Sequence, residues 1–264
     1  MDNRNELGNT FDTAVSLYDK MRPGYVDDIY KAIFEYVNID ENSSVVEVGS
    51  GSGQASLPIL RKGCEFTSVE YGENFSNILK DKFKEYDKFN VVTGKFEDVK
   101  LESNKYDLVF SATAFHWVPE EIGYPKVHSM LKSEGAFARF ANRPSTSQND
   151  PDLALKIDSL YNEYYNKYYG IKPGNKTMFT EEKAKEISLI PAKYGFRDIK
   201  YYLFYRERIF SAKEYIQLLG TYSDHIAMDE SIRNEFFAKI EEAINNRGGS
   251  ITISDTLDLE LARK

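Results

Sequence analysis

Cysteine, tryptophan and histidine are scarce in this chain of 264 residues, which contains one Cys, one Trp and three His. The single cysteine, Cys64, excludes an internal disulfide and fits a reducing compartment. No cluster of His, Cys and acidic residues has the spacing of metal ligands, so the sequence predicts no metal site. No apolar run approaches the roughly 18 residues that a membrane span needs, so we expect no membrane partner.

The chain also has no apolar leader and no excess of basic residues. The first residues, 1–6, are polar and no apolar core follows them, so we expect a cytoplasmic protein without a secretory signal. With 34 Lys and Arg against 42 Asp and Glu, the net charge is −8 at pH 7. Such an acidic chain, without a long Lys/Arg run, predicts no nucleic-acid partner. The sequence leaves the oligomeric state open.

Short apolar strands alternate with helices in the first half of the chain. Strands are predicted at residues 45–48, 65–70, 90–93, 107–111 and 135–141. Helices are predicted at residues 26–37, 54–60, 74–85 and 119–131. This alternation implies a parallel sheet with helices on both faces and right-handed crossovers.

After residue 142 the pattern changes to a polar loop followed mainly by helices. The loop is predicted at residues 142–151, and further helices at 153–169, 181–190, 212–220 and 230–245. Two late strands are predicted, at residues 199–210 and 249–261. We interpret these strands as the end of the same sheet, with helical insertions before and after the first of them.

A glycine turn between the first strand and the next helix predicts a small-molecule site. Gly49, Gly51 and Gly53 allow positive φ and let a ligand approach the backbone, and the helix end would offer unpaired N–H groups. The spacing is G-x-G-x-G, whereas dinucleotide sites have G-x-G-x-x-G, and Gln54 stands where the third glycine would be.

Acidic and aromatic residues follow the next strands. Glu70 ends the second strand, where it could bond both ribose hydroxyls of an adenosine, or be an exposed strand-end acid. Phe96 could cover an adenine, and an acidic side chain or a backbone group nearby could bond its amine. Alternatively, Glu97 and Asp98 belong to a charged loop. Glu47, inside the first strand, would be a costly buried carboxylate, and a ligand amine is a natural partner for it.

The order and spacing of these residues resemble class I S-adenosylmethionine-dependent methyltransferases over residues 40–142. Residues 112–118, Ala-Thr-Ala-Phe-His-Trp-Val, are similar to the subgroup of small-molecule methyltransferases related to trans-aconitate methyltransferase, called methyltransferase domain type 11. Residues 18–25 resemble the N-terminal segment of that subgroup, and residues 218–223 its C-terminal half.

The resemblance implies an α/β fold, a Rossmann-like doubly wound sheet of seven mostly parallel strands with one antiparallel strand at its edge. It implies a single methyltransferase domain. Residues 1–40 would form an N-terminal helical lid, residues 41–142 the cofactor-binding core, and residues 143–264 the substrate-side helices and last two strands.

S-adenosylmethionine is the cofactor that the resemblance implies. The residues predicted to bind it are Tyr18, Arg22, Glu47, Gly49, Ser50, Gly51, Gly53, Gln54, Glu70, Tyr71, Phe96, Glu97, Ser111, Ala112, Phe115 and Trp117. Arg22 would pair with the cofactor's carboxylate, or be a surface arginine of the lid. Tyr18 and Tyr25 would shield the sulfonium with their ring faces. Trp117 would pack near the cofactor or anchor its loop.

Methyl transfer rests mainly on alignment, proximity and exclusion of water. His116 is the catalytic candidate, as a base or donor facing the acceptor, or else a structural histidine that locks its loop. The residues predicted on the acceptor side are Tyr25, Arg139, Tyr222, Ser223 and His225. Arg139 and its neighbour Arg143 would recognise an acidic acceptor, or be surface charge.

The sequence therefore predicts an S-adenosylmethionine-dependent methyltransferase that acts on a small molecule. One alternative is a non-catalytic cofactor-binding or regulatory protein, which the residues do not exclude. Another is a nucleotide-dependent oxidoreductase, against which Gln54 and the motif after the fourth strand argue. The chemical class of the acceptor stays open, because one fold serves many acceptors.

Overall fold

The computed structural model describes residues 21–22, 24–174 and 179–264, and Tyr18 lies outside them. The described residues form two compact units. The sheet unit comprises residues 24–142, 179–204 and 257–264. The helical unit comprises residues 21–22, 143–174 and 205–256.

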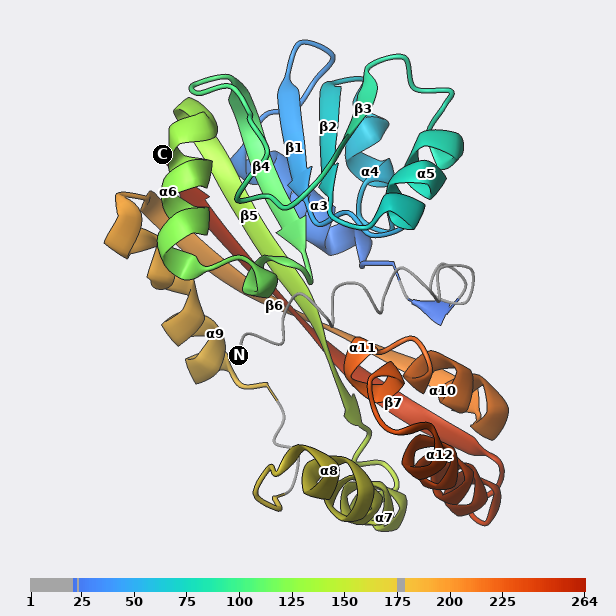
Figure 1. Ribbon diagram of the computed structural model, residues 1–264. Coiled ribbons are helices and arrows are strands. Elements are labelled where there is room, and N and C mark those ends of the chain that lie inside the picture. Colours follow the sequence, from blue (N-terminus) through green and yellow to red (C-terminus); the bar gives the residue numbers. More distant parts are fainter. Residues whose placement is uncertain (1–20, 23, 175–178) are drawn as a thin grey trace. The chain divides into compact units, whose positions relative to one another are not determined.

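Seven strands of the described chain form one sheet in the order β3-β2-β1-β4-β5-β7-β6 (Figure 1). They are β1 (Ser44–Val48), β2 (Glu65–Glu70), β3 (Phe89–Thr93), β4 (Tyr106–Ala112), β5 (Leu131–Thr146), β6 (Arg197–Ser211) and β7 (Ser250–Arg263). The pairs β1–β2, β1–β4, β2–β3 and β4–β5 are parallel, which confirms the predicted mostly parallel sheet.

Strand β7 runs antiparallel to β5. In the helical unit Ser147 N–H donates to Thr252 O, and in the sheet unit Lys264 N–H donates to Gly135 O. The start of β7 therefore lies beside the end of β5. The predicted place of the antiparallel strand was wrong by one position, because β6 lies outside β7 in the sheet order.

Helices cover both faces of the strands in the sheet unit. These helices are α3 (Asp27–Tyr36), α4 (Leu57–Leu60), α5 (Glu73–Lys82), η1 (Phe115–Trp117), α6 (Glu120–Met130), α9 (Glu181–Ser188) and η3 (Ile190–Tyr194). Successive residues of a strand point to opposite faces. Val45 packs in a buried cluster with α3, α4 and α5, whereas Val46 and Val48 pack in another with α6. This alternation confirms the doubly wound arrangement.

The helical unit has a core of its own. Its helices are α7 (Pro151–Leu160), η2 (Tyr161–Asn166), α8 (Lys167–Tyr169), α10 (Ala212–Leu219), α11 (Ser223–Ile226) and α12 (Glu230–Asn245). Their apolar faces share a buried cluster that includes Leu153, Phe236 and Ile251. The helices stand before and after β6, as predicted. Among the described residues, none of the helices combines the length and apolar character that a membrane crossing requires.

Several predicted boundaries were wrong, and two of them have a clear physical reason. The helix predicted from Gln54 begins at Leu57, because Gly51 and Gly53 adopt left-handed φ of 54° and 81°, which a right-handed helix excludes. The polar loop predicted at residues 142–151 is strand up to Thr146. There β5 continues beside β7, and Ser145 Oγ donates to Ser254 O at 3.2 Å. Pairing with a distant strand outweighs local polarity.

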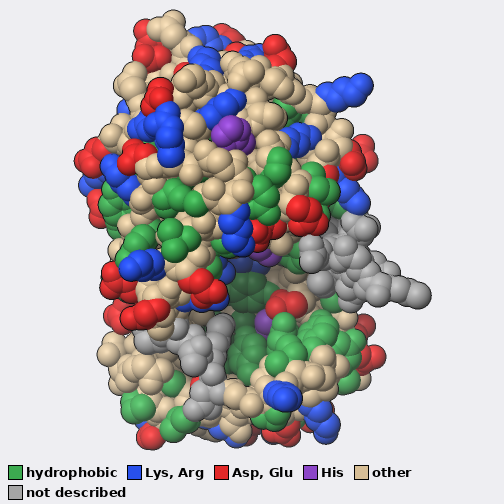
Figure 2. Space-filling view, turned by 90° about the vertical axis from the view of Figure 1, so that its left-hand side faces the viewer, with side chains coloured by type: hydrophobic (Ala, Val, Ile, Leu, Met, Phe, Trp, Pro, Cys, Tyr) green, Lys and Arg blue, Asp and Glu red, His purple; other side chains and the backbone are tan. Residues whose placement is uncertain are grey.

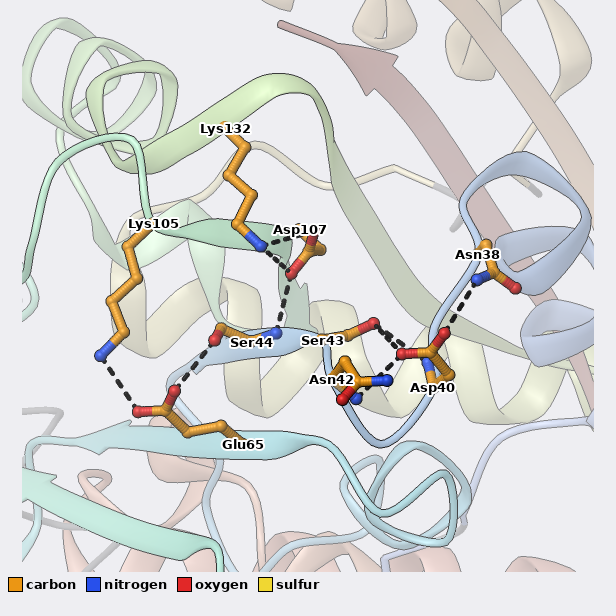
Figure 3. Close-up of polar contacts among 9 residues, drawn as sticks. All are labelled: Asn38, Asp40, Asn42, Ser43, Ser44, Glu65, Lys105, Asp107 and Lys132. Atoms are coloured by element: carbon orange, nitrogen blue, oxygen red, sulfur yellow. Dashed lines mark hydrogen bonds and ion pairs between the residues drawn. The ribbon is translucent and has the colours of Figure 1, made fainter.

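The amino ends of the central strands are tied by a polar network (Figure 3). The Asp107 carboxylate accepts from Ser44 N–H at 2.8 Å and from Lys132 Nζ at 2.8 Å. Ser44 Oγ donates to Glu65 Oε2 at 2.9 Å, and Lys105 Nζ to Glu65 Oε1 at 3.0 Å. These charges hold β1, β2, β4 and β5 in register. Open α/β sheets bind ligands at the opposite ends of their strands, the carboxyl ends.

Candidate active site

The glycine loop after β1 has a shape that only glycine permits. Gly49, Gly51 and Gly53 all have positive φ, of 72°, 54° and 81°. A Cβ on Gly49 would lie 2.4 Å from Ala114 Cβ, and one on Gly53 would lie 2.6 Å from the Phe83 ring. The loop therefore runs close to its neighbours and keeps its backbone uncovered by side chains of its own glycines.

Glu70 is fixed against this loop. It ends β2, one strand away from the loop, and is only 8% exposed. Its Oε2 accepts from Gly51 N–H at 2.7 Å, and its Oε1 accepts from Gly72 N–H at 2.9 Å. These two bonds from backbone N–H groups orient the carboxylate beside the loop. Glu70 thus lies at the carboxyl end of β2 beside the glycine loop, and its ribose role stays a prediction.

Beneath the loop lies a buried carboxyl among serine hydroxyls. Glu47 is 1% exposed, and its Oε2 accepts from Ser56 Oγ at 2.5 Å. Burial is the largest influence on Glu47 and raises its pKa to about 8, although hydrogen bonds from Ser56 and Ser50 oppose the shift. Ser68 Oγ donates to Ser50 Oγ at 2.6 Å. The neutral carboxyl is poised to ionise when a cation comes near it.

Two further polar contacts restrain Ser52 of the glycine loop, and the sequence did not predict them. Gln54 Nε2 donates to Ser52 Oγ at 2.5 Å, and Lys82 Nζ donates to Ser52 O at 2.8 Å. Gln54 therefore helps to shape the loop. Tyr71, predicted to bind the cofactor, is 39% exposed and the centroid of its ring lies 5.7 Å from Lys95 Nζ.

The end of β4 lies beside the end of β1. Ser111 Oγ donates to Val48 O at 2.7 Å, next to the start of the glycine loop. After Ala112 the chain turns into η1, where Phe115 is buried in the core. His116 is exposed and Trp117 half-buried, with ring centroids 4.9 Å apart. His116 is thus placed on the surface of the turn, where a ligand can reach it.

Phe96 and Glu97 belong to the loop after β3. Phe96 is 4% exposed and its ring centroid lies 6.4 Å from that of Phe115. Lys126 Nζ, from α6, donates to three carbonyls of this loop, those of Phe96 at 2.5 Å, Glu97 at 3.2 Å and Val99 at 2.6 Å. A lysine in α6 thus sets the loop that was predicted to meet the adenine, and the sequence carried no signal for it.

Replacing this lysine should loosen the loop. We expect Lys126→Met to lower the free energy of unfolding by about 2 kcal/mol, because carbonyl groups of a partly buried loop lose a charged donor. Lys84→Met is the matched control, since Lys84 pairs with Asp81 on the exposed surface, and surface pairs contribute about 0–1 kcal/mol. Chemical denaturation measures both. Equal stabilities of the two variants would contradict the bracing role.

Two residues predicted on the acceptor side have protein partners in the sheet unit. Arg139 Nε donates to Glu260 Oε2 at 2.5 Å, and Glu260 is buried. Its charge is thereby balanced within the protein. The hydroxyl of Tyr25 lies 2.7 Å from Thr113 Oγ1, at the turn that leads to η1.

The other predicted residues belong to the helical unit. Arg22 Nη2 donates to Thr221 O at 3.2 Å, and its guanidinium carbon lies 4.2 Å from the centroid of the Tyr222 ring. Ser223 and His225 are buried in α11. His225 Nδ1 lies 2.8 Å from Asp224 Oδ1, and its Nε2 lies 3.1 Å from the Tyr161 hydroxyl. The structure thus brings Arg22 and Tyr222 together, and it surrounds His225 with partners.

Asp224, the neighbour of His225, has a lowered pKa. Burial alone would raise the pKa of Asp224, but hydrogen bonds from His225 and Tyr165 hold it at about 2. Tyr165 Oη donates to Asp224 Oδ2 at 2.7 Å. Sequence reasoning missed Asp224, Tyr161 and Tyr165 as partners of His225, although tyrosines recur at helical spacing from residue 161 to 169. Among the described residues no group of His, Cys, Asp and Glu could hold a metal ion.

Residues 46–138 match the family model described as methyltransferase domain. The match covers the glycine loop, Glu70 and the turn at η1. This match and the relatives described below support a class I S-adenosylmethionine-dependent methyltransferase. The methyltransferase domain match also supports S-adenosylmethionine as the cofactor, as the resemblance implied. The resemblance to the trans-aconitate methyltransferase subgroup stays a prediction.

Relatives of this methyltransferase extend over most of its length. An uncharacterized methyltransferase of Schizosaccharomyces pombe is 26% identical over 239 residues, 90% of this chain and 88% of the relative. A protein named ribosomal RNA small subunit methyltransferase A, from Borreliella afzelii, is 23% identical over 88% of this chain and 83% of its own. The similarity therefore includes both units.

Solved structures share the fold of this methyltransferase. A protein of Anaeromyxobacter dehalogenans, provisionally described as a type II methyltransferase, has a TM-score of 0.63 at 16% identity, covering 92% of this chain and 97% of the other. Phosphoethanolamine N-methyltransferase 2 of Haemonchus contortus, in complex with phosphomonomethylethanolamine and S-adenosylhomocysteine, has a TM-score of 0.55 at 13% identity. That likeness covers 96% of this chain and 57% of the other.

Proposed function

We propose that this methyltransferase transfers the methyl group of S-adenosylmethionine to a small-molecule acceptor. The observation that carries the proposal is the Glu70 carboxylate, which is held by Gly51 N–H at 2.7 Å beside a loop of three left-handed glycines. Such a site suits a ligand that carries the diol of a ribose and lies close to the backbone of the glycine loop. The G-x-G-x-G spacing, with Gln54 where a dinucleotide site has its third glycine, argues against a dinucleotide oxidoreductase.

The residues of the loop fit this cofactor in chemistry as well as in shape. Glu70 would accept hydrogen bonds from the ribose hydroxyls, and Glu47 would meet the ammonium of the amino-acid end. Gly49 and Gly53 admit no Cβ, because Ala114 and the Phe83 ring lie where it would point, and their positive φ sets the course of the loop. When bound, the cofactor supplies an electrophilic methyl group on a sulfonium, and the protein's part is to align that carbon with the acceptor.

His116 would act on the acceptor. It is exposed at the turn after β4, and η1 fixes its backbone next to the half-buried Trp117. An imidazole changes charge near neutral pH, so it could take a proton from a hydroxyl, amine or thiol acceptor. A carboxylate acceptor has no such proton, and His116 would then only donate a hydrogen bond. Tyr222, Ser223 and His225, in the helical unit, stay predictions for the acceptor side.

A small acceptor is favoured over a nucleic acid by charge. The chain carries 42 acidic against 34 basic residues. On the face shown in Figure 2, acidic and basic side chains are intermingled. Tight binding to a phosphate backbone needs several lysines or arginines close together. The relative named as a ribosomal RNA methyltransferase makes RNA the second acceptor class to test.

Cofactor binding is the first experiment. We expect S-adenosylhomocysteine to bind saturably in calorimetric titration and to raise the melting temperature, whereas NAD and NADP should do neither. Methyl transfer is then tested by incubating the protein with S-adenosylmethionine that carries a radiolabelled methyl group. The label that appears on small carboxylates, amines, phenols and thiols is measured. Labelling of RNA alone would overturn the small-molecule assignment. Binding without transfer to any acceptor would favour a non-catalytic, regulatory protein.

A further inference from the structure

The turn between β4 and η1 begins with a residue in an unfavourable backbone conformation. Thr113 has φ of 55°, in the left-handed region that β-branched residues avoid. Its N–H donates to Phe140 O at 2.8 Å, and Asn142 N–H donates to Thr113 Oγ1 at 3.3 Å. Contacts with its surroundings, rather than its own preference, therefore hold Thr113 in place.

Tyr25 contributes to that restraint from the segment just before α3. The Tyr25 and Thr113 hydroxyl oxygens are 2.7 Å apart, an ordinary length for a hydrogen bond between hydroxyls. The Tyr25 ring meets the Phe140 ring edge-on, with centroids 4.8 Å apart. The ring contact fixes the direction of the hydroxyl. The bond thus joins the N-terminal segment to a turn 88 residues away in sequence.

The turn between β4 and η1 contacts the glycine loop. Ala114, directly after Thr113, approaches Gly49 so closely that a Cβ on that glycine would lie 2.4 Å from the Ala114 Cβ. If Thr113 relaxed to an ordinary φ, Ala114 would move, and the packing of the turn against the loop would change. Close-packed contacts of this kind transmit small shifts.

We propose that Tyr25 is a positioning residue, whose hydrogen bond to Thr113 holds the turn bearing Ala114, His116 and Trp117 against the glycine loop in the geometry that binds the cofactor. Tyr25 acts through Thr113 and need not touch the sulfonium or the acceptor. The inference rests on the cofactor site of the proposed function and adds a part played by the N-terminal segment.

Trp117 provides the test, because it is the only tryptophan of the chain and lies in the turn itself. In Tyr25→Phe, we expect acrylamide to quench Trp117 fluorescence more strongly, since the turn becomes looser. The dissociation constant for S-adenosylhomocysteine should rise about 2- to 10-fold, the usual effect of one lost hydrogen bond. Thr113→Val, which lacks the hydroxyl, should show the same stronger quenching and weaker binding. Thr113→Ser, which keeps a hydroxyl, should behave like the wild type.

Tyr30→Phe is the matched control, because Tyr30 also packs edge-on against Phe140 and its hydroxyl donates to Ala55 O at 3.3 Å. A merely structural tyrosine would lower the melting temperature without changing the quenching of Trp117. The double variant Tyr25→Phe/Thr113→Val should bind no more weakly than Thr113→Val alone. Additive effects, or quenching equal to that of the wild type, would overturn the proposal. If the wild type binds no S-adenosylhomocysteine, the proposed function fails, while the quenching comparison still decides the role of Tyr25.

Discussion

Replacing Glu70 by alanine should weaken the binding of S-adenosylhomocysteine by about 100-fold or more. A charged acceptor contributes roughly 1.5–3 kcal/mol to each hydrogen bond, and a ribose offers two hydroxyls to one carboxylate. Glu70 also accepts from Gly51 N–H and Gly72 N–H, so its loss leaves two loop amides without their partner side chain. We expect a lower melting temperature in addition to weaker binding, measured by calorimetry and thermal denaturation.

Two further variants separate binding from loop stability. Glu70→Gln keeps an oxygen acceptor and the side-chain shape, so it should retain more stability than Glu70→Ala while still binding weakly. Glu65→Gln changes an acid at the other end of the same strand, where it contacts Ser44 and Lys105. It should leave the dissociation constant unchanged. Undiminished affinity in Glu70→Ala would rule out the ribose role.

Replacing Glu47 by glutamine should remove a large part of the pH dependence of stability. Burial raises the pKa of Glu47 to about 8 in the folded protein, against 4.5 for an ordinary glutamate. The folded state then binds more protons than the unfolded state between these values, so the wild type loses stability as pH rises from about 4.5 to about 8. Glu47→Gln should gain roughly 3 to 5 kcal/mol relative to the wild type across that interval.

Denaturation at pH 5, 6.5 and 8 measures this difference, and Ser56→Ala is a useful companion. Ser56 Oγ donates to the Glu47 carboxyl, so its removal should raise the pKa of Glu47 further and extend the loss of stability to higher pH. If an ammonium group of the cofactor meets Glu47, binding at pH 7 should release a proton. Calorimetry in buffers of different ionisation enthalpy detects that release.

If the stability of Glu47→Gln depended on pH as that of the wild type does, the raised pKa of Glu47 would be contradicted.

Much of the fold could be predicted because its local patterns are strong. The strand at residues 65–70 and the helix at residues 230–245 have the predicted bounds, since apolar periodicity and turn residues agree there. Helix α11 was missed because four residues carry too little pattern. The π-helical turns of η2, at residues 161–166, were predicted only as part of a longer helix, because sequence periodicity does not distinguish π from α turns.

The candidate site was predicted in part. Gly49, Gly51, Gly53 and Glu70 could be found because the glycines and the strand-end acid follow a fixed spacing. Lys126 was missed, since its three carbonyl partners are brought to it by the packing of α6 against the loop after β3. The buried partner of Arg139 was missed for the same reason, because β7 reaches β5 only in the folded sheet.

The sequence by itself determined the doubly wound class, the glycine loop and the acid at its edge, because each depends on residues near one another along the chain. The tertiary structure decided which charges are already balanced, where the antiparallel strand lies, and that Thr113 holds a left-handed conformation beside Tyr25. Those features depend on contacts between residues far apart in sequence. Their energies come from burial and hydrogen-bond geometry, which arise only when distant segments pack together.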